Sequence, residues 1–465
     1  MSVATSAGVR VLKFGGSSLA DARRISAVAT IVRRERAASP LVLVVSALEG
    51  VTAALLRAAT AASRREGAVW EGVGEELRRR HLEALEALLP EPERPLVQDQ
   101  LERALRDFHE LCSGFALVRE LPPRSLDSLA SLGELVAAAL VAAHLRSQGL
   151  SAEALDAAEL IVSDDRHGHA SALPELTRTR VRGRLLPLLE QGAIPVVTGF
   201  RAATRDGSCT TLGRGGSDYS ATILGATLAA DAVWIFTDVP GMMTADPELV
   251  GSAHVISRLS YQEAMELAFF GAKVLHARSL DLPERSRIPV FVKNTFDPQA
   301  HGTEIGPGGG GRSGVRALAA TGEAVLFTVT GAPGVGFPRL ASLIFGGLDA
   351  LEVSTLLVTQ SSAENVLTFA VPSTEAAEVR RRLERERGRV LAEVEVLERM
   401  GVVVAVGDGM RGTPGIAARI FGALASHGIN VRAIAQGSGE LSISWVLRSE
   451  DVGPAVRAVH REFGL

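Results

Sequence analysis

The chain has 465 residues, of which 46% are apolar and 22% charged, and this length predicts about three folded domains. Its 49 Lys and Arg residues nearly balance 53 Asp and Glu residues, and the net charge of −4 argues against general binding to nucleic acid or membrane surfaces. The two cysteines, Cys112 and Cys209, form neither a disulfide framework nor a CxxC metal pair. No apolar run reaches membrane-spanning length, and no signal-peptide pattern is visible. We therefore expect a reduced, cytoplasmic protein with no nucleic-acid or membrane partner.

The first part of the chain alternates between strand and helix patterns. Short apolar runs predict strands at 9–14, 41–45, 151–156, 194–199, 233–237 and 288–293. Helical patterns lie between them, and residues 52–148 are mostly helical with breaks at prolines. This alternation predicts an α/β fold with a mostly parallel sheet.

The last third of the chain contains an internal repeat. A Gly-rich stretch, 306–314, predicts a linker. After it, residues 326–371 align without gaps onto 402–447, with 11 identical positions at an offset of 76. Each copy reads as strand, Gly/Pro loop, helix, strand, polar loop and strand, which indicates two tandem α+β domains whose strands could interleave. We expect domains at 1–308, 318–395 and 396–465.

A first candidate site follows the first predicted strand. Lys13 precedes Gly15, Gly16 and Ser17, where small residues let backbone N–H groups approach an anion closely. The lysine would add a mobile positive charge for phosphate oxygens. An ordinary strand-to-helix turn is the alternative interpretation.

A second candidate is the Gly-rich segment 210–220, which opens a predicted helix. Arg214 in this loop can grip a carboxylate with two hydrogen bonds. Ser217 or Asp218 can cap the helix, and Asp218 can in addition orient Lys13 or a magnesium ion.

Thr237 and Asp238 form a third candidate, at the end of the 233–237 strand, and the segment continues to Asp246. Open α/β sheets bind ligands at the carboxyl ends of their strands, so we expect the three candidates to converge on one site. The alternative is that polar residues commonly follow strands.

Other motifs carry less weight. Residues 407–412 match G-x-G-x-x-G, but too little chain follows for a dinucleotide-binding domain. There is no P-loop, HExxH or GxSxG sequence. His167 and His169 read as surface or loop residues, and His276 as structural.

Taken together, the motifs resemble the aspartate kinase family over nearly the whole chain. The matching segments, in order, are KFGGSS, VSALEGVT, GELVAAAL, PVVTGFRAAT, TTLGRGGSDYSA, TDVPG, TADP, SYQEAMELAFFGAKVLH and KNTFDP. The repeat is similar to the paired ACT regulatory domains of the threonine-sensitive branch, as in VTQSSAEN and AIAQGSGELSIS. The resemblance implies a three-layer αβα amino-acid-kinase domain with a mostly parallel sheet, followed by two small ferredoxin-like ACT domains.

This resemblance implies transfer of the γ-phosphoryl group of ATP to the side-chain carboxylate of L-aspartate, the first step of lysine, threonine and methionine biosynthesis. Lys13 and Asp218 would be catalytic, and Mg²⁺ would bind mainly through ATP oxygens, so no metal ligand is named. Substrate would be bound by Ser46, Glu134, Arg214 and Ser217, with Arg214 on the α-carboxylate and Glu134 on the ammonium group. The positions that match nucleotide-contacting residues are Lys13, Gly15, Gly16, Ser17, Thr237, Asp238, Met243, Asp246 and Lys273.

For regulation, the resemblance implies an amino-acid effector at the ACT domains, threonine ahead of lysine, and a homodimer or larger assembly formed through them. Gln360 and Gln436 occupy equivalent repeat positions, and their amides can hydrogen-bond a small polar ligand.

The chain departs from the family pattern at Met243, Glu248 and Ala137, where tyrosine, arginine and serine are usual. Glu248 reverses a charge near the expected nucleotide end. Two alternatives therefore stay open: an amino-acid sensor with a decayed kinase domain, or the same fold acting on glutamate, acetylglutamate or a nucleotide. The chain ends after the second repeat, so we expect no homoserine dehydrogenase portion.

Overall fold

A computed structural model describes residues 8–271, 274–308, 314–361 and 365–465. The chain divides into two compact units, one of Met1–Met242 with Val274–Pro307 and the other of Met243–Lys273 with Gly308–Leu465. Residues 243–273 therefore pack with the C-terminal unit, although the sequence places them within the segment 1–308. The expected linker falls largely outside the described residues.

The first unit is built on a sheet in the strand order β3-β4-β2-β1-β7-β9-β10. All of these pairs are parallel except β9 with β10. The strands are β1 Arg10–Phe14, β2 Leu41–Val45, β3 Ala152–Leu155, β4 Ile194–Thr198, β7 Ala232–Thr237, β9 Val290–Asn294 and β10 Thr303–Gly306. Two short strands, β5 Arg201–Ala203 and β6 Cys209–Thr211, form a separate hairpin. The predicted parallel α/β sheet is confirmed.

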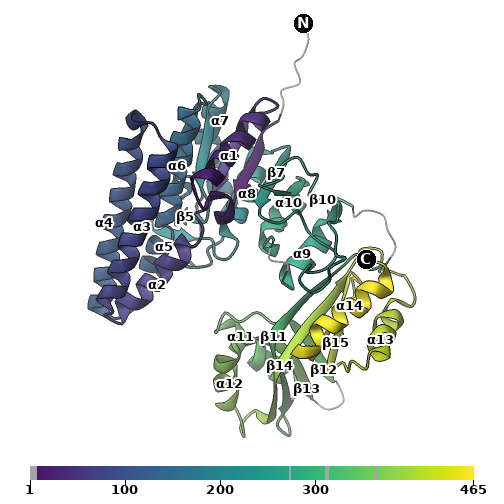
Figure 1. The fold of residues 1–465 in the computed structure, drawn as a ribbon. Helices are drawn as coiled ribbons and strands as arrows, with labels where there is room; N and C mark the ends of the chain where they lie inside the picture. The colour runs from purple at the N-terminus through teal and green to yellow at the C-terminus, as the bar shows by residue number, and fades with distance from the viewer. Residues whose placement is uncertain (1–7, 272–273, 309–313, 362–364) are drawn as a thin grey trace. The chain divides into compact units, whose positions relative to one another are not determined.

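Helices cover both faces of this sheet, which makes three layers (Figure 1). Leu12 and Phe14 of β1 pack with α1 and α6 in one core cluster. Lys13 alternates to the opposite face, where α8 packs, because successive side chains of a strand point to opposite sides. The helices of these layers are α1 Ala22–Arg36, α6 Leu132–Ser147, α7 Pro174–Glu190, α8 Gly216–Leu228 and α10 Asp281–Ser286.

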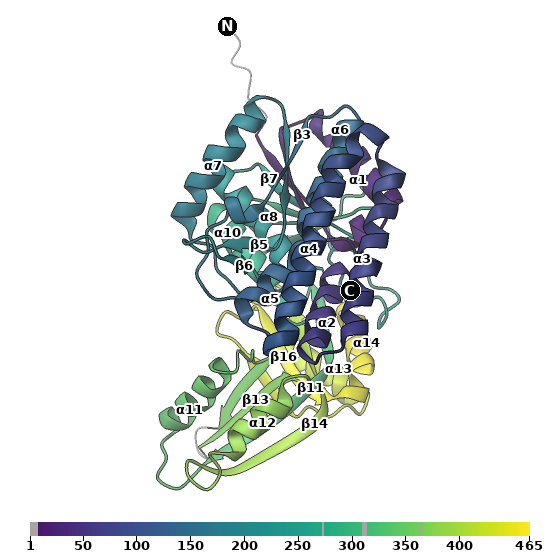
Figure 2. The ribbon, with the colours of Figure 1, turned by 90° about the vertical axis from the view of Figure 1, so that its left-hand side faces the viewer.

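A helical subdomain follows β2 and has its own apolar core. Its helices are α2 Val51–Ser63, α3 Gly67–Leu88, α4 Arg94–Val118 and α5 Pro123–Ala130 (Figure 2). The stretch Pro123–Ser147 is apolar and long enough to cross a membrane by composition, but 83% of its most apolar window is buried within the protein, as in a core helix.

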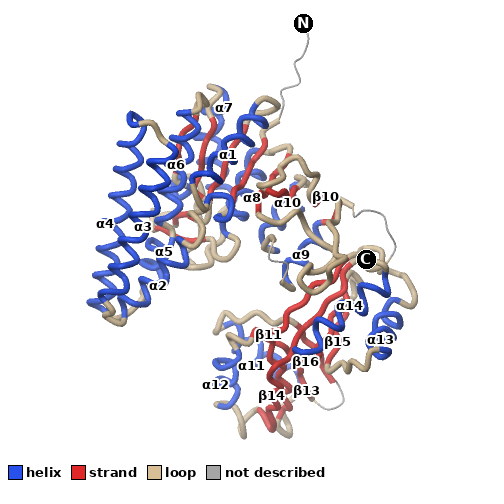
Figure 3. The backbone as a smooth tube through the Cα atoms, viewed as in Figure 1, coloured by secondary structure: helices blue, strands red, loops and turns tan. Residues whose placement is uncertain are grey.

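The second unit contains a six-stranded sheet in the order β12-β13-β11-β14-β16-β15, with helices packed on it (Figure 3). The strands are β11 Ala317–Gly331, β12 Leu357–Ser361, β13 Val366–Pro372, β14 Leu391–Val406, β15 Ala433–Gln436 and β16 Ser442–Arg448. The helices of the repeat are α11 Phe337–Asp349, α12 Ala376–Glu384, α13 Ile416–Ser426 and α14 Val452–Phe463. Corresponding pairs form in both copies, as Leu326 with Ala370 and Val402 with Val446.

The two repeat copies exchange strands. The first part of β11, 317–321, pairs with 402–406 of β14, whereas the first part of β14, 391–397, pairs with 326–331 of β11. The strand preceding each copy therefore completes the sheet of the other copy. Strand order in each half follows the ferredoxin-like pattern that the family resemblance implies, and the two halves form one continuous sheet.

The segment 243–273 is integral to the second unit and holds β8 Arg258–Ser260 and α9 Tyr261–Phe269. Ala245 and Val250 pack in the core cluster that includes Trp445. Glu263, which is fully buried, accepts hydrogen bonds from the backbone N–H groups of Ser260 at 2.8 Å and Asp408 at 2.9 Å. A carboxylate thus already binds one N–H group of the 407–412 loop, consistent with the rejection of a dinucleotide site there.

Candidate active site

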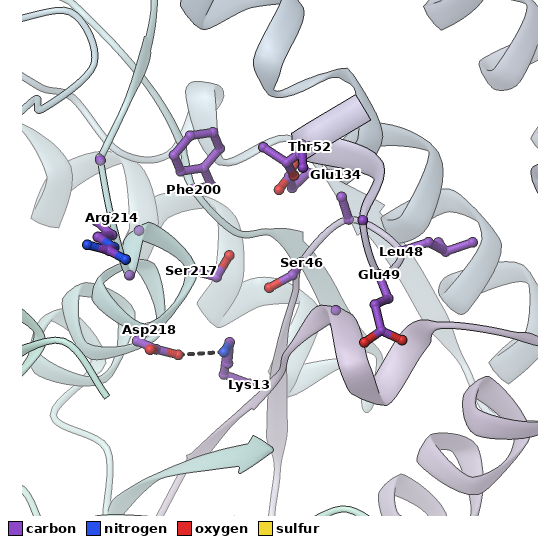
Figure 4. A pocket seen from close by; sticks show the side chains of 17 residues that line it. Lys13, Ser46, Leu48, Glu49, Thr52, Glu134, Phe200, Arg214, Ser217 and Asp218 are labelled. Atoms are coloured by element: carbon purple, nitrogen blue, oxygen red, sulfur yellow. Dashed lines mark ion pairs between the residues drawn. The ribbon is translucent and has the colours of Figure 1, made fainter. Parts of the chain in front are cut away.

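Lys13 and Asp218 form an ion pair between the end of β1 and the first turn of α8. Nζ of Lys13 lies 2.6 Å from Oδ1 of Asp218, and the two side chains are only 11% and 10% exposed (Figure 4). Burial weakens screening by water, so the pair fixes the position of the ammonium group. The expected orientation of Lys13 by Asp218 is therefore present in the structure.

Gly15 and Gly16 leave open space beside this ammonium group. A Cβ on Gly15 would lie 3.3 Å from Nζ of Lys13, and a Cβ on Gly16 would lie 3.2 Å from the carbonyl oxygen of Ala47. Side chains at either position would crowd the lysine or the neighbouring turn. The absence of side chains thus allows an anion to approach both the backbone and Lys13.

A cavity of about 470 Å³ opens next to the ion pair. Its wall comes from the end of β1, the turn after β2, the start of α6, the loop after β4 and the turn before α8 (Figure 4). The predicted residues that line it are Lys13, Gly16, Ser46, Glu134, Arg214, Ser217 and Asp218. The first and second candidate segments therefore converge on one cavity.

Two left-handed glycines shape the turn that precedes α8. Gly213 has φ 76° and Gly215 has φ 68°, a conformation that favours glycine. A Cβ on Gly215 would lie 2.3 Å from Cβ of His276, so no side chain fits there. This packing fixes the turn that presents Arg214, Ser217 and Asp218, and it gives His276 the structural role expected from the sequence.

Phe200 also lines the cavity, although the sequence analysis did not single it out. Its backbone has φ 66°, and its N–H donates to Oγ of Ser220 on α8 at 3.1 Å. Left-handed φ in a bulky residue is strained, and such strain gathers at functional sites. In the sequence, Phe200 is marked only by its membership of the family-like segment PVVTGFRAAT.

Glu134 is a buried carboxyl group on the cavity wall. Burial raises its pKa to about 7, opposed by a hydrogen bond from the backbone N–H of Ala47 and by the positive charge of Arg201. Its Oε2 has no hydrogen-bond partner among the described residues. A buried carboxylate oxygen without a partner is costly, so this atom is suited to accept a hydrogen bond from a cationic ligand.

A hydrogen-bond network that the sequence analysis missed supports the turn from outside the cavity. Asp127 of α5 accepts hydrogen bonds from Nδ1 of His167 at 2.8 Å, from the backbone N–H of Gly168 at 3.0 Å and from Oγ1 of Thr211 at 2.5 Å. A Cβ on Gly213 would lie 2.9 Å from the carbonyl oxygen of Gly168. The loop bound by Asp127 therefore lies against the turn that carries Arg214. His167 lies in this loop, as expected from the sequence, and takes part in the network.

Of the residues expected to bind the nucleotide, only Lys13 and Gly16 line the cavity described above, and the other described ones lie elsewhere. Thr237 and Asp238 follow β7, and Oγ1 of Thr237 donates to Oδ1 of Asp238 at 3.1 Å. Met243 and Asp246 belong to the second unit, where Asp246 accepts from the backbone N–H of Glu248 at 2.9 Å. Ser17 lies in the 3₁₀ turn Gly16–Leu19, and Lys273 lies outside the described residues.

Gln360 and Gln436 lie on β12 and β15, the two outer strands of the second sheet, and both are exposed. These strands approach each other. The repeat-equivalent glutamines therefore occupy equivalent places in the fold, and their role as effector ligands stays a prediction.

Comparison with known proteins agrees with this architecture. Residues 8–294 match the amino acid kinase family, and residues 403–463 match the ACT domain. The chain thus belongs to the amino acid kinase family and carries an ACT domain near its C-terminal end.

The chain is also similar to individual aspartokinases. Lysine-sensitive aspartokinase 3 of Escherichia coli is 32% identical over 97% of this chain and 98% of its own length. The crystal structure of E. coli aspartokinase III in complex with aspartate and ADP covers 98% of this chain and 100% of its own, with a TM-score of 0.87 and 30% identity. A bifunctional aspartokinase/homoserine dehydrogenase from Zea mays is 33% identical over 98% of this chain, which spans 50% of that relative. The chain belongs to the aspartokinase family.

Proposed function

We propose that the protein is an aspartate kinase, which transfers the γ-phosphoryl group of ATP to the side-chain carboxylate of L-aspartate and yields 4-phospho-L-aspartate and ADP. The observation that carries the proposal is the cavity on which the Lys13–Asp218 pair, Arg214 and Glu134 converge. The relative of known structure was crystallised with aspartate and ADP, which supports the same pair of ligands here.

Aspartate recognition uses the two opposite charges of the cavity wall. The guanidinium of Arg214 binds the α-carboxylate, and the unpartnered Oε2 of Glu134 accepts from the α-ammonium group. Hydroxyl groups of Ser46 and Ser217 line the same cavity and can hydrogen-bond the substrate (Figure 4). The side-chain carboxylate then lies toward Lys13.

Phosphoryl transfer at this site needs no general base. The attacking carboxylate is already ionised at neutral pH; its oxygen bonds to the γ-phosphorus as the bond to the ADP oxygen breaks, and no proton moves. The residues align the reactants and neutralise charge. Lys13, held by Asp218, stabilises the negative charge on the transferring group, and Gly15 and Gly16 give its oxygens room.

The nucleotide is proposed to contact Ser17, Thr237, Asp238, Met243, Asp246 and Lys273 in addition to Lys13, Gly15 and Gly16. Among the described residues no three His, Cys, Asp or Glu side chains gather as a metal site. This fits Mg²⁺ held largely by phosphate oxygens, with Asp218 as the carboxylate at the cradle. When bound, Mg²⁺ neutralises phosphate charge.

The second unit is proposed to regulate the first through an amino-acid effector, threonine before lysine, bound near Gln360 and Gln436. Residues 318–395 and 396–465 would be the two ACT domains, and 1–308 the catalytic segment. We further propose a cytoplasmic homodimer or larger assembly. An effector inhibits only if it binds the inactive state more tightly than the active one, so kinase activity titrated with each amino acid tests this proposal. No response to either would discard it.

The catalytic proposal is tested by trapping the acyl phosphate with hydroxylamine in the presence of ATP. Aspartate should give hydroxamate, and glutamate, acetylglutamate and nucleotides should not. If only another acceptor gave a product, that acceptor would be the substrate instead of aspartate. Amino-acid binding without product from any acceptor would identify a sensor with an inactive kinase unit.

A further inference from the structure

A second large cavity lies in the first repeat copy, between α11 and α12, and encloses about 710 Å³. Its lining is largely polar and includes three arginines. The residues that line it are Arg339, Ser342, Leu343, Gly346, Gly347, Arg382, Glu386, Arg389 and Val390. We call it the arginine groove.

The arginine groove carries a net positive charge, with three arginines and one glutamate. Arg382 donates to Oε1 of Glu386 at 3.0 Å, so that carboxylate is already paired. A Cβ on Gly347 would lie 3.5 Å from Nε of Arg382, which places the guanidinium over this glycine. Among the described residues, no side chain accepts a hydrogen bond from Arg339 or Arg389, so two guanidinium groups are available to a ligand.

The repeat supplies an internal comparison. At the offset of 76, the three arginines correspond to Gly415, Ala458 and Leu465 in the second copy. There, Arg419 of α13 donates to Oε1 of Glu462 at 2.8 Å and lies 4.2 Å from the ring centre of Phe463, so α13 and α14 are joined directly.

The first copy differs in backbone as well as in charge. Helix α12 ends at Glu384, which corresponds to His460 at the offset of 76, whereas α14 continues to Phe463, three positions further. In the second copy the Arg419–Glu462 pair joins the two helices, and none of the three equivalent positions is an arginine, so the three arginines of the groove are a feature of the first copy's sequence.

We propose that the arginine groove binds a small anion bearing at least two oxyanion groups. Arginine presents its donors as a planar fork that matches carboxylate and phosphate oxygens. The volume lies within the range of small-molecule sites. The groove lies on the helices, whereas Gln360 lies on the outer strand β12, so the two proposed ligands would occupy different places in this copy.

In the test, the whole 465-residue chain is titrated with inorganic pyrophosphate and, separately, with citrate, and binding is measured by calorimetry. A variant with Arg339→Gln, Arg382→Gln and Arg389→Gln is compared with a matched control, Arg380→Gln, Arg381→Gln and Arg385→Gln. The control removes the same charge from α12 and the residue that follows it, outside the groove lining. The Lys13→Met variant, measured in parallel, removes one of the two cationic side chains that line the kinase cavity and so weakens anion binding there.

We expect one site that persists in Lys13→Met and in the control, and at least tenfold weaker binding in the groove variant. A ligand that binds only the folded state also raises the unfolding temperature, and this rise should disappear in the groove variant alone. Pyrophosphate binding without citrate binding would identify a phosphate ligand, and the reverse a carboxylate ligand. The proposal is overturned if the groove variant binds as tightly as the parent, or if the groove variant and the control lose affinity equally. It is also overturned if neither probe binds. These outcomes do not depend on kinase activity.

Discussion

Lys13 of β1 and Asp218 of α8, which lie far apart in the sequence, meet at 2.6 Å beside the cavity that also holds Arg214 and Glu134. The register of the sheet explains the encounter. Lys13 lies opposite Val44 of β2 and Ile235 of β7, in the centre of the sheet, on the face that α8 covers. The pair therefore joins the glycine segment after β1 to the turn that carries Arg214.

Removal of either partner of this pair should abolish most of the activity. Lys13→Met removes the charge that stabilises the transferring phosphoryl group, and Asp218→Asn releases the lysine, so we expect kcat to fall about 100- to 1000-fold in each. Arg10→Gln is the control, because Arg10 lies on the same strand and pairs with Glu35. Turnover measured with saturating aspartate and ATP checks this, and a Lys13→Met enzyme with parental kcat would contradict the mechanism.

Glu134 predicts a pH dependence of aspartate binding. Burial raises its pKa to about 7, and binding an ammonium group requires the ionised form. The KM for aspartate should therefore rise as the pH falls below 7, by about tenfold per pH unit at the limit. In Glu134→Gln we expect a raised KM whose pH profile lacks this bend. A bend that persists in the variant would assign the titration to another group.

The raised pKa of Glu134 also predicts that the stability of the fold decreases as the pH rises, whereas aspartate binding improves. When a carboxyl group has a higher pKa in the folded than in the unfolded protein, its ionisation destabilises the folded state. Stability should therefore fall as the pH rises from about 4.5 to about 7, by roughly 3 kcal/mol if no other group compensates. Glu134→Gln should be more stable than the parent at pH 8 and similar at pH 5, as measured by urea unfolding.

Much of the site could be predicted from the sequence, because it follows local rules. Lys13 and the glycines end a strand, Arg214 and Asp218 open a helix, and the carboxyl ends of parallel strands meet at one edge. The packing of residues 243–273 with the second unit could not be predicted, since the only clear break in composition is at 306–314. The sequence alone does not decide whether strands exchange, because the repeat alignment begins at 326, whereas β11 begins at Ala317.

Asp127 illustrates what local patterns cannot reveal. Its bond to Thr211 joins residues 84 positions apart, and neither residue lies in a recognisable motif with the other. The two residues meet only because α5 packs against β6 in the folded unit.

Loss of the Asp127 carboxylate should impair aspartate binding more than catalysis with bound substrates. In Asp127→Ala the hydroxyl of Thr211 and the N–H of Gly168 lose their acceptor, so the turn that presents Arg214 loses support. We expect the KM for aspartate to rise about tenfold with little change in the KM for ATP, and stability to fall by about 1–3 kcal/mol. Thr211→Ser retains the hydroxyl and should behave like the parent, whereas Thr211→Val should resemble a milder Asp127→Ala. Equal effects on both KM values would indicate general loosening of the unit instead.

Gly401 tests the strand exchange of the second unit. It lies in β14 opposite the irregularity of β11 between Thr321 and Ala324, and a Cβ there would lie 2.2 Å from Cγ2 of Val452 and 2.8 Å from the carbonyl oxygen of Thr321. Gly401→Ala should therefore destabilise this unit by about 1–3 kcal/mol, because overpacking forces neighbouring groups apart. Hydrogen exchange should accelerate in β14 and β16 and stay unchanged in β1 and β2. Gly422→Ala is the control, since Gly422 lies in α13 with open space around its Cβ position and alanine favours helix. Unchanged exchange in Gly401→Ala would show that β11 and β14 do not meet as described.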